Sequence, residues 1–179
     1  MKTTQILFAG FGGQGILFAG KFLAYKGLME DLQVSWLPSY GPEMRGGTCN
    51  CSVNIDDEPI GSPLVTTPDI LIAMNKPSLL KFEGKVAVGG TIVLDSSLID
   101  VETSRNDVTA YYIPATQMAK DAGFSTLANM ILTGKILSEL GEFDEESIKT
   151  ALNKVVSAKH PEMFDFNMKA LALGRDYAE

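Results

Sequence analysis

Residues 5–15 read Gln-Ile-Leu-Phe-Ala-Gly-Phe-Gly-Gly-Gln-Gly, the segment that most clearly indicates the type of fold. Its first half, Gln5–Ala9, is a short apolar run ended by a glycine, which is typical of a buried strand. From Gly13 to about Gly27 apolar residues recur at helical spacing, and Gly27 is a suitable C-terminal stop. The sequence therefore predicts a strand, a glycine-rich turn and a helix in direct succession.

The rest of the chain continues this alternation and then becomes helical. Strand-like runs are predicted at 34–37 (ended by Pro38), 48–55, 69–74, 90–95 and 108–113, with a short helix opening at Lys76. Helical periods cover 118–140, 145–157 and 163–177, broken by Gly123, Gly141 and Pro161, and Asp144 is a good N-cap. The pattern predicts one α/β domain over residues 1–179. It is a Rossmann-like open, mostly parallel sheet with helices on both faces and a helical C-terminal third.

Composition excludes several classes of function. The 179 residues carry 15 Lys+Arg against 22 Asp+Glu, so the formal net charge of −7 disfavours a nucleic-acid-binding role. No apolar stretch is long enough to cross a bilayer, and the N-terminus lacks the features of a signal peptide. We therefore expect a cytoplasmic protein with neither nucleic acid nor membrane as a partner.

The glycine loop Gly10–Gly15 matches G-x-G-x-x-G between a strand and a helix. Glycines permit positive φ and close backbone approach, and a helix N-terminus attracts a phosphate, pyrophosphate or carboxylate. A dinucleotide site also needs an acid at the end of the second strand, where Leu37-Pro38-Ser39 stands instead. No Walker lysine follows the loop. An anion site is therefore the functional hypothesis, and a tight turn that only permits helix packing is the alternative.

A second candidate segment, Pro38–Gly47, follows the second predicted strand and should overhang the same edge of the sheet. Its two prolines and three glycines favour a defined path. Arg45 could offer its guanidinium to a phosphate or to a partner's carboxylate. A surface salt bridge with Glu43 is the alternative interpretation.

Cys49 and Cys51 form a C-x-C pair that is too tight for an ordinary disulfide. The only imidazole, His160, is far away in sequence, so four metal ligands cannot be assembled from these residue types. We interpret both cysteines as small buried or half-buried strand residues and expect no metal site. We interpret His160 as a turn residue and Trp36 as a core or interface residue.

Taken together, these motifs resemble the gamma subunit of the 2-oxoacid:ferredoxin oxidoreductases over essentially the whole chain. The segments that carry the resemblance are Gly10–Gly15, 39–48, 61–63, 69–75 with Pro77-Ser78, 113–116, 127–130 with Gly134, and 167–174. Tyr-Gly-Pro-Glu-Met-Arg-Gly-Gly at 40–47 is most similar to the 2-oxoglutarate and branched-chain 2-oxoacid types. The pyruvate type is less similar. The indolepyruvate oxidoreductase small subunit shares the glycine loop but differs before Arg-Gly-Gly.

The resemblance implies a non-catalytic chain within an oxidoreductase complex. The complex would convert a 2-oxoacid, with 2-oxoglutarate as the expected substrate, together with coenzyme A (CoA) and oxidised ferredoxin into acyl-CoA, CO2 and reduced ferredoxin. Thiamine diphosphate with Mg would lie between the alpha and beta subunits, and the iron–sulfur clusters would belong to beta or a delta subunit. No cofactor is expected on this chain alone, and no complete active site.

The same resemblance implies two sets of site residues. Gly12, Gly13, Gln14, Gly15, Arg45 and Asn129 are candidates for binding CoA or a phosphate. Tyr40, Pro42, Glu43, Met44 and Arg45 are candidates for a subunit interface.

The alternative functions of the chain belong to other classes than a CoA-binding subunit. One is an assembly subunit whose loops only dock a partner, and another is a stand-alone nucleotide-binding protein.

Asn129, inside a predicted helix, would bind loop backbone or ligand, or else satisfy a core carbonyl. Gly134 in the same helix predicts close packing. An isolated gamma subunit should also self-associate through an exposed apolar patch.

Overall fold

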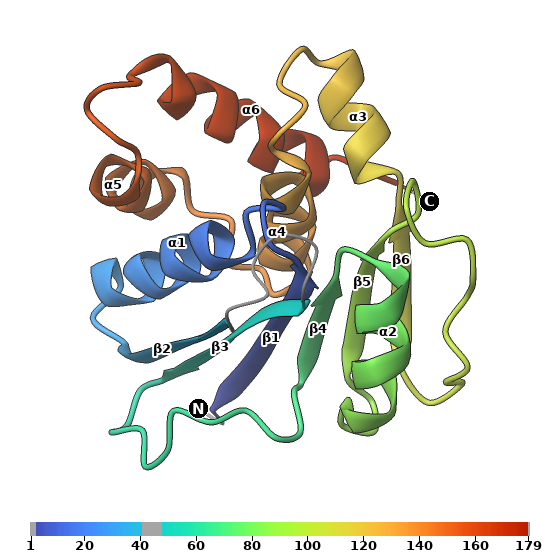
Figure 1. The fold of residues 1–179 in the computed structure, drawn as a ribbon. Coiled ribbons are helices and arrows are strands. Elements are labelled where there is room, and N and C mark those ends of the chain that lie inside the picture. Colours follow the sequence, from blue (N-terminus) through green and yellow to red (C-terminus); the bar gives the residue numbers. More distant parts are fainter. Residues whose placement is uncertain (1–2, 41–47, 179) are drawn as a thin grey trace.

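The structure is a computed structural model that describes residues 3–40 and 48–178, and it has helices on both sides of a six-stranded sheet (Figure 1). The strands are β1 (Thr4–Phe11), β2 (Gln33–Tyr40), β3 (Thr48–Asp56), β4 (Ile70–Ala73), β5 (Thr91–Asp95) and β6 (Thr109–Ile113). The helices are α1 (Ile16–Met29), α2 (Lys76–Phe82), the 3-10 turn η1 (Glu83–Lys85), α3 (Ala115–Asp121), α4 (Ala128–Glu139), α5 (Glu145–Val155) and α6 (Glu162–Arg175).

The sheet has the order β2-β3-β1-β4-β5-β6. The pairs β1–β4, β4–β5 and β5–β6 are parallel, whereas β3 runs antiparallel to both of its neighbours. The strand β3 is reversed relative to its neighbours because residues 41–47, which separate it from β2, are fewer than a parallel crossover connection needs. The predicted mostly parallel α/β sheet is confirmed.

The register of β1, β2 and β3 brings two loop regions to one edge of the sheet. Phe11 at the end of β1 pairs with Thr48 at the start of β3, and Tyr40 at the end of β2 pairs with Cys49. Because β1 and β2 end at this edge, the glycine loop leaves the sheet beside the residues that flank segment 41–47. The expectation that both connections share one edge is confirmed for these flanking residues.

The prediction that Pro38 ends the second strand is wrong. The strand β2 continues through Pro38, opposite Cys51, to Tyr40. Proline is tolerated there because β2 is the edge strand, so a residue without an N–H can face away from the ladder. Trp36 on the same strand is 36% exposed, which makes it only partly a core residue.

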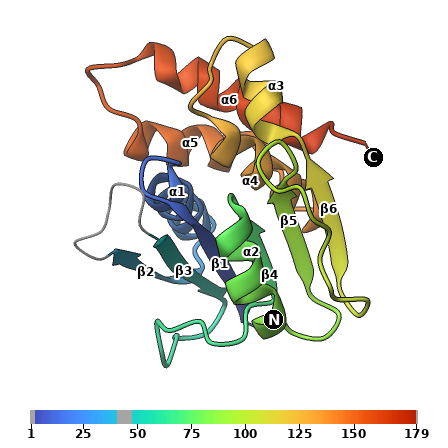
Figure 2. The same cartoon turned by 45° about the vertical axis from the view of Figure 1, so that its right-hand side comes forward.

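The two faces of the sheet bury different cores, and the two views show α1 and α4 on one side and α2 on the other (Figures 1 and 2). Alternate residues of β1 divide between them: Ile6 and Phe8 join the larger core with α1, α4, α5 and α6, whereas Leu7 and Ala9 join the smaller core with α2. The helices α5 and α6 form a further layer outside α1 and α4 (Figure 2). The glycine loop is thereby placed next to the C-terminal helices.

The helical C-terminal third follows the predicted breaks. Gly123, with a φ of +83°, separates α3 from α4, and Gly141, with a φ of +68°, follows α4. Asp144 caps α5 by accepting a 2.7 Å hydrogen bond from the Ser147 N–H, as predicted. Among the described residues no helix combines the length and apolar character needed to cross a membrane.

Candidate glycine-loop site

The glycine loop depends on two residues with left-handed backbone. Gly13 has a φ of +97° and Gly15, the N-cap of α1, a φ of +73°. The N-cap has no side-chain hydrogen bond, and the first turn of α1 carries no acidic residue. The free N–H groups at this helix start, with the positive end of its dipole, are available to an anion.

Gln14 uses its side-chain amide within the protein. Its Oε1 accepts a 2.6 Å hydrogen bond from the Phe11 N–H, and its Nε2 donates to the Met74 carbonyl over 2.8 Å. These bonds link the ends of β1 and β4 and fix the path of the loop. Gln14 therefore shapes the predicted site, and direct contact between its amide and a ligand stays a prediction.

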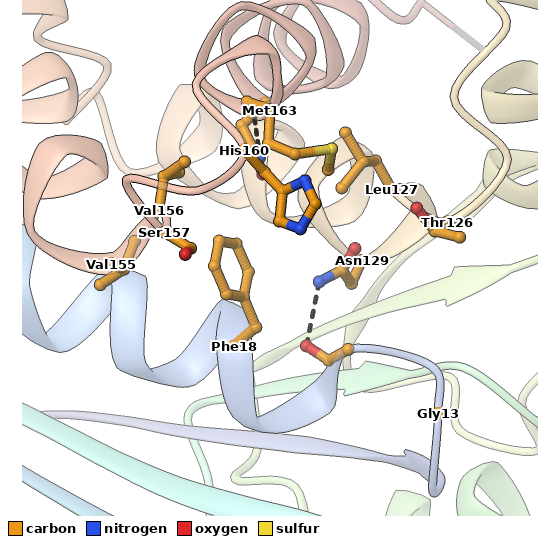
Figure 3. A pocket seen from close by; sticks show the side chains of 12 residues that line it. Gly13, Phe18, Thr126, Leu127, Asn129, Val155, Val156, Ser157, His160 and Met163 are labelled. Carbon is orange, nitrogen blue, oxygen red and sulfur yellow. Dashed lines mark hydrogen bonds between the residues drawn. The ribbon is translucent and has the colours of Figure 1, made fainter.

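Asn129, near the start of α4, reaches the same loop. Its Nδ2 donates to the Gly15 carbonyl over 2.9 Å, and its side chain lies so close to Gly15 that a Cβ there would overlap the amide (Figure 3). The expectation that Asn129 binds loop backbone is confirmed. The bond joins two segments 114 residues apart in sequence.

A pocket of about 410 Å³ lies between this loop and the turn that joins α5 to α6 (Figure 3). Gly13, Gly15, Ser157 and His160 are among the residues that line it. The apolar part of its wall comes from α1, the start of α4, the end of α5 and the start of α6, namely Phe18, Leu127, Val155, Val156 and Met163. Such a lining, mostly apolar with a few convergent polar groups, is typical of a small-molecule site.

Two asparagines that line the pocket have unsatisfied oxygens. Asn129 is 2% exposed and Asn167 is 1% exposed. Neither Oδ1 atom has a hydrogen-bond partner among the residues that the structure describes. Buried amide oxygens are nearly always paired in native proteins, so these two are exceptions to the usual pattern.

His160 lies on the turn between α5 and α6, where its N–H donates to the Ser157 carbonyl over 3.0 Å. Its Nδ1 is 3.3 Å from Glu162 Oε1, and its ring projects into the pocket toward Asn129 (Figure 3). The predicted turn position is confirmed. Its place in the pocket was not predicted, because no local sequence signal relates residue 160 to the glycine loop.

Asn167 was also missed as a site residue. The family resemblance includes it only as the first residue of segment 167–174. A usable signal did exist, because an amide on the buried stripe of a helix is as unusual at 167 as at 129. That both asparagines line one pocket follows from the crossing of α4 and α6, which the sequence does not reveal.

The remaining predicted residues are placed only in part. Gly12 lies half-buried in the glycine loop, and Tyr40 ends β2 opposite Cys49 of β3. Pro42, Glu43, Met44 and Arg45 lie outside the described residues, so their roles stay predictions.

The cysteines show the properties of core residues. Both are free and buried, and burial, the largest influence, raises the pKa of Cys51 to about 12 despite a hydrogen bond from Trp36. The raised pKa keeps the Cys51 thiol protonated at neutral pH, as expected of a buried core residue. Within 3–40 and 48–178, no group of three or more His, Cys, Asp or Glu residues could hold a metal ion.

Comparison with known proteins gives a consistent result. The profile of the family described as "Pyruvate ferredoxin/flavodoxin oxidoreductase" matches residues 5–177. The chain is 41% identical over 99% of its length to ketoisovalerate oxidoreductase subunit VorA of Methanothermobacter marburgensis, but spans only 37% of that protein. It is 33% identical to 2-oxoglutarate synthase subunit KorC of the same organism, over 96% of this chain and 95% of that one.

Two solved structures share the fold. A keto/oxoacid ferredoxin oxidoreductase gamma subunit from Geobacter sulfurreducens superposes with a TM-score of 0.81 and 26% identity, covering 97% of this chain and 96% of that one. The 2-oxoglutarate:ferredoxin oxidoreductase of Magnetococcus marinus, solved with 2-oxoglutarate, coenzyme A and succinyl-CoA bound, gives a TM-score of 0.85 and 29% identity. That match covers 98% of this chain and 31% of the other.

Proposed function

The chain belongs to the pyruvate ferredoxin/flavodoxin oxidoreductase family, and from this premise we propose that it is the gamma subunit of a 2-oxoacid:ferredoxin oxidoreductase. The assembled enzyme would convert a 2-oxoacid, CoA and oxidised ferredoxin into acyl-CoA, CO2 and reduced ferredoxin. The match to KorC carries the proposal, since each chain covers almost the full length of the other.

The partners and location follow from the same proposal. The chain would form one domain over residues 1–179 and assemble in the cytoplasm with alpha and beta subunits, and in some enzymes a delta subunit. When bound in those subunits, thiamine diphosphate with Mg would supply the decarboxylation chemistry, and iron–sulfur clusters would supply the electron path to ferredoxin. The two cysteines of this chain are fewer than the four thiolates that an iron–sulfur cluster ordinarily takes, so the clusters are assigned to other subunits.

The contribution of this chain would be to hold CoA at the glycine loop. The uncapped start of α1 offers N–H donors and a favourable dipole to the CoA phosphates. Gln14 and Asn129 hold that loop by hydrogen bonds to backbone at Phe11, Met74 and Gly15, so the donors are oriented before the ligand arrives. The chain provides binding and orientation, and other subunits provide the catalytic residues.

The relatives support two different candidate substrates. The full-length match to a 2-oxoglutarate synthase subunit favours 2-oxoglutarate. The higher identity to a ketoisovalerate oxidoreductase subunit favours 2-oxoisovalerate, although the chain spans about a third of that relative. The test is CoA-dependent reduction of a viologen dye by the purified complex with each 2-oxoacid in turn. The proposed function fails if neither substrate, nor pyruvate or indolepyruvate, supports reduction.

A substitution separates the CoA-binding role from a purely architectural one. Arg45→Ala, chosen from the sequence alone, is expected to raise the KM for CoA by about 5- to 150-fold, the equivalent of about 1–3 kcal/mol for a charged hydrogen bond. An assembly subunit would instead lose complex yield while the surviving complex kept its KM for CoA.

A further inference from the structure

We propose that a groove between β2, β3 and the end of α2 is a docking site for a partner subunit, and that it takes a segment with an apolar side chain next to an aspartate or glutamate. That the partner is another subunit of the oxidoreductase rests on the proposed function. The groove borders the smaller core, on the opposite face of the sheet from the glycine-loop pocket, so it can be tested apart from CoA binding.

The groove is an open end of the smaller core. The helix α2 packs on β1 and β4 (Figure 2), and residues 63–66 lie against the β2–β3 end of the same face. Between them is a space of about 280 Å³ whose apolar lining includes Leu7, Leu37, Leu64 and Phe82. Leu7 and Phe82 are buried, Leu37 is half-buried and Leu64 is 61% exposed. The core therefore reaches the surface at this groove and ends there on apolar side chains.

A buried asparagine fixes the wall that carries Leu64. Asn54 of β3 is fully buried, and its Nδ2 donates to the Pro63 carbonyl over 3.2 Å, while its Oδ1 accepts a 3.1 Å bond from Gln5 Nε2. The segment 61–63, one of those that carry the family resemblance, is thereby tied to the sheet. Leu64 follows directly, so its exposed side chain is presented from a fixed backbone, which lowers the entropic cost of binding.

Two lysines give the groove a positive rim. Lys81 Nζ lies 5.2 Å and Lys85 Nζ 5.5 Å from the centroid of the Phe82 ring, which lines the groove. Both lysines are exposed, and neither forms an ion pair with another residue that the structure describes. Of the described residues that line the groove, only Lys85 is charged. Its charge is opposite to the net charge of −7 on the whole chain, so the groove favours a carboxylate from its partner.

The size of the groove suits a side chain of a protein more than a free small molecule. Its volume of about 280 Å³ lies below the range of about 300–1,000 Å³ that is typical of ligand pockets. One leucine or phenylalanine side chain of the partner would pack between Leu37, Leu64 and Phe82, with a neighbouring carboxylate beside Lys85. An apolar anchor in a pocket with a polar rim is the usual arrangement of a protein–protein hot spot. The net charge of −7 works against a second copy of this chain as the occupant.

The test is a competition between a variant and the wild type for the same partners. The two forms, carrying different tags, are co-expressed at matched levels with the alpha and beta subunits of the same organism, and the amount of partner captured by each is measured. Leu64→Asp, which places a charge on the apolar wall, should capture at least about tenfold less partner than the wild type. Circular dichroism verifies that this variant is folded.

Val88→Asp is the matched control. Val88 is also a large apolar residue, 84% exposed, but it lies between η1 and β5 and does not line the groove. This variant should compete equally with the wild type. Equal competition by Leu64→Asp, or an equal loss in both variants, would overturn the proposal.

A second arm tests the charge of the docked segment. A carbodiimide joins lysine amines to carboxylates in contact with them, and mass spectrometry then locates the joined residues in the wild-type complex. We expect Lys85 to be joined to an aspartate or glutamate of a partner subunit. Lys85→Glu should capture at least about threefold less partner than the wild type, whereas Lys85→Arg, which keeps the charge, should compete equally. No link from Lys85 to another subunit, a link only to a second copy of this chain, or undiminished capture by Lys85→Glu would each overturn the proposal.

The wild-type complex separates this proposal from the proposed function. If the complex forms and is active but the groove variants compete equally, the subunit role stands and the docking site is refuted. If the groove variants lose their partners as expected but the complex is inactive with every 2-oxoacid, the proposed function alone fails. If the wild type captures neither subunit, both fail.

Discussion

At the scale of single residues, Gly15 satisfies two requirements at once. Its φ of +73° is strained for any residue with a Cβ, and a Cβ there would overlap the Asn129 amide. We expect Gly15→Ala to lower the free energy of unfolding by about 2 kcal/mol, from backbone strain plus steric overlap. Urea denaturation followed by circular dichroism measures the change.

Gly13→Ala separates the cost of backbone strain from the cost of steric overlap. Gly13 also has a positive φ, +97°, but an added Cβ meets nothing within 4 Å. Its substitution should therefore cost only the strain, about 1 kcal/mol. Asn129→Gly should bring the cost of Gly15→Ala down to that of Gly13→Ala. Equal effects of the two alanine substitutions in the wild type would argue against the close approach of Asn129.

The site residues could be predicted from sequence only where chemistry is local. Gly13 and Gly15 were recognisable because a glycine fingerprint between a strand and a helix specifies its own backbone. The bond from Asn129 to the loop needed the family resemblance, because it joins residues 114 positions apart. Asn167 and His160 reach the pocket only through tertiary packing, which no period or motif encodes.

At the scale of elements, α4 and α6 cross at two glycines. A Cβ on Gly134 would overlap the Leu171 carbonyl, and one on Gly174 would overlap the Ile131 carbonyl. Backbone atoms cannot yield as a flexible side chain can. We expect Gly134→Ala to destabilise by about 3 kcal/mol in urea denaturation, despite the better helix propensity of alanine.

Gly84→Ala serves as the control for that crossing. Gly84 lies in η1 and has open space around its Cβ position, so its substitution should change stability by less than about 0.5 kcal/mol. A Gly134→Ala protein as stable as the wild type would contradict the close helix crossing. The sequence predicted this close packing at Gly134, whereas the partner helix and its Gly174 required the structure.

The connection between β5 and β6 is held by Glu83 of η1. Its carboxylate accepts hydrogen bonds from Thr103 Oγ1 at 2.6 Å and from the Ser104 N–H at 3.0 Å. Burial acts to raise the pKa of Glu83, but these bonds and the charge of Arg105 outweigh it and lower the pKa below its ordinary value. The ionised group therefore stabilises the fold above the ordinary glutamate range, near 4.3, and less as the pH falls.

Glu83→Gln tests this pH dependence. At pH 7 the variant should unfold at lower urea concentration than the wild type. The difference should shrink as the pH falls below about 4, where the wild-type carboxyl becomes protonated and resembles an amide. Glu102→Gln, an exposed carboxylate in the same connection, should show little difference at either pH. A constant difference for Glu83→Gln across the pH range would contradict the role of its ionised form.

Which segments form strands and which form helices was largely predictable, because hydrophobic periodicity and capping residues are properties of neighbouring residues in the sequence. The residues at which strands and helices begin and end were less predictable. Pro38 ends a strand by its own chemistry, yet β2 passes through it because an edge position leaves its missing N–H without consequence. The reversed direction of β3 depends on the short connection from β2, which the alternation of strands with helices does not reveal.

At the scale of the whole molecule, the chain is a candidate for self-association when it is separated from its partners. Several large apolar side chains are exposed, including Leu64 at 61%, Leu80 at 58% and Val88 at 84%. We expect the isolated chain to form dimers or larger species in light scattering coupled to gel filtration. A strictly monomeric chain at 100 µM, about the upper range of such runs, would argue against the predicted apolar interface.

Gentle anaerobic purification of the tagged protein from its native host, followed by identification of the proteins that accompany it, tests the proposed subunit role most directly. We predict recovery with thiamine-diphosphate and iron–sulfur subunits, and dye reduction by a 2-oxoacid that requires CoA. Recovery of the chain alone, with tight binding of a nucleotide other than CoA, would contradict the subunit role. The glycine loop would then be the site of an independent nucleotide-binding protein.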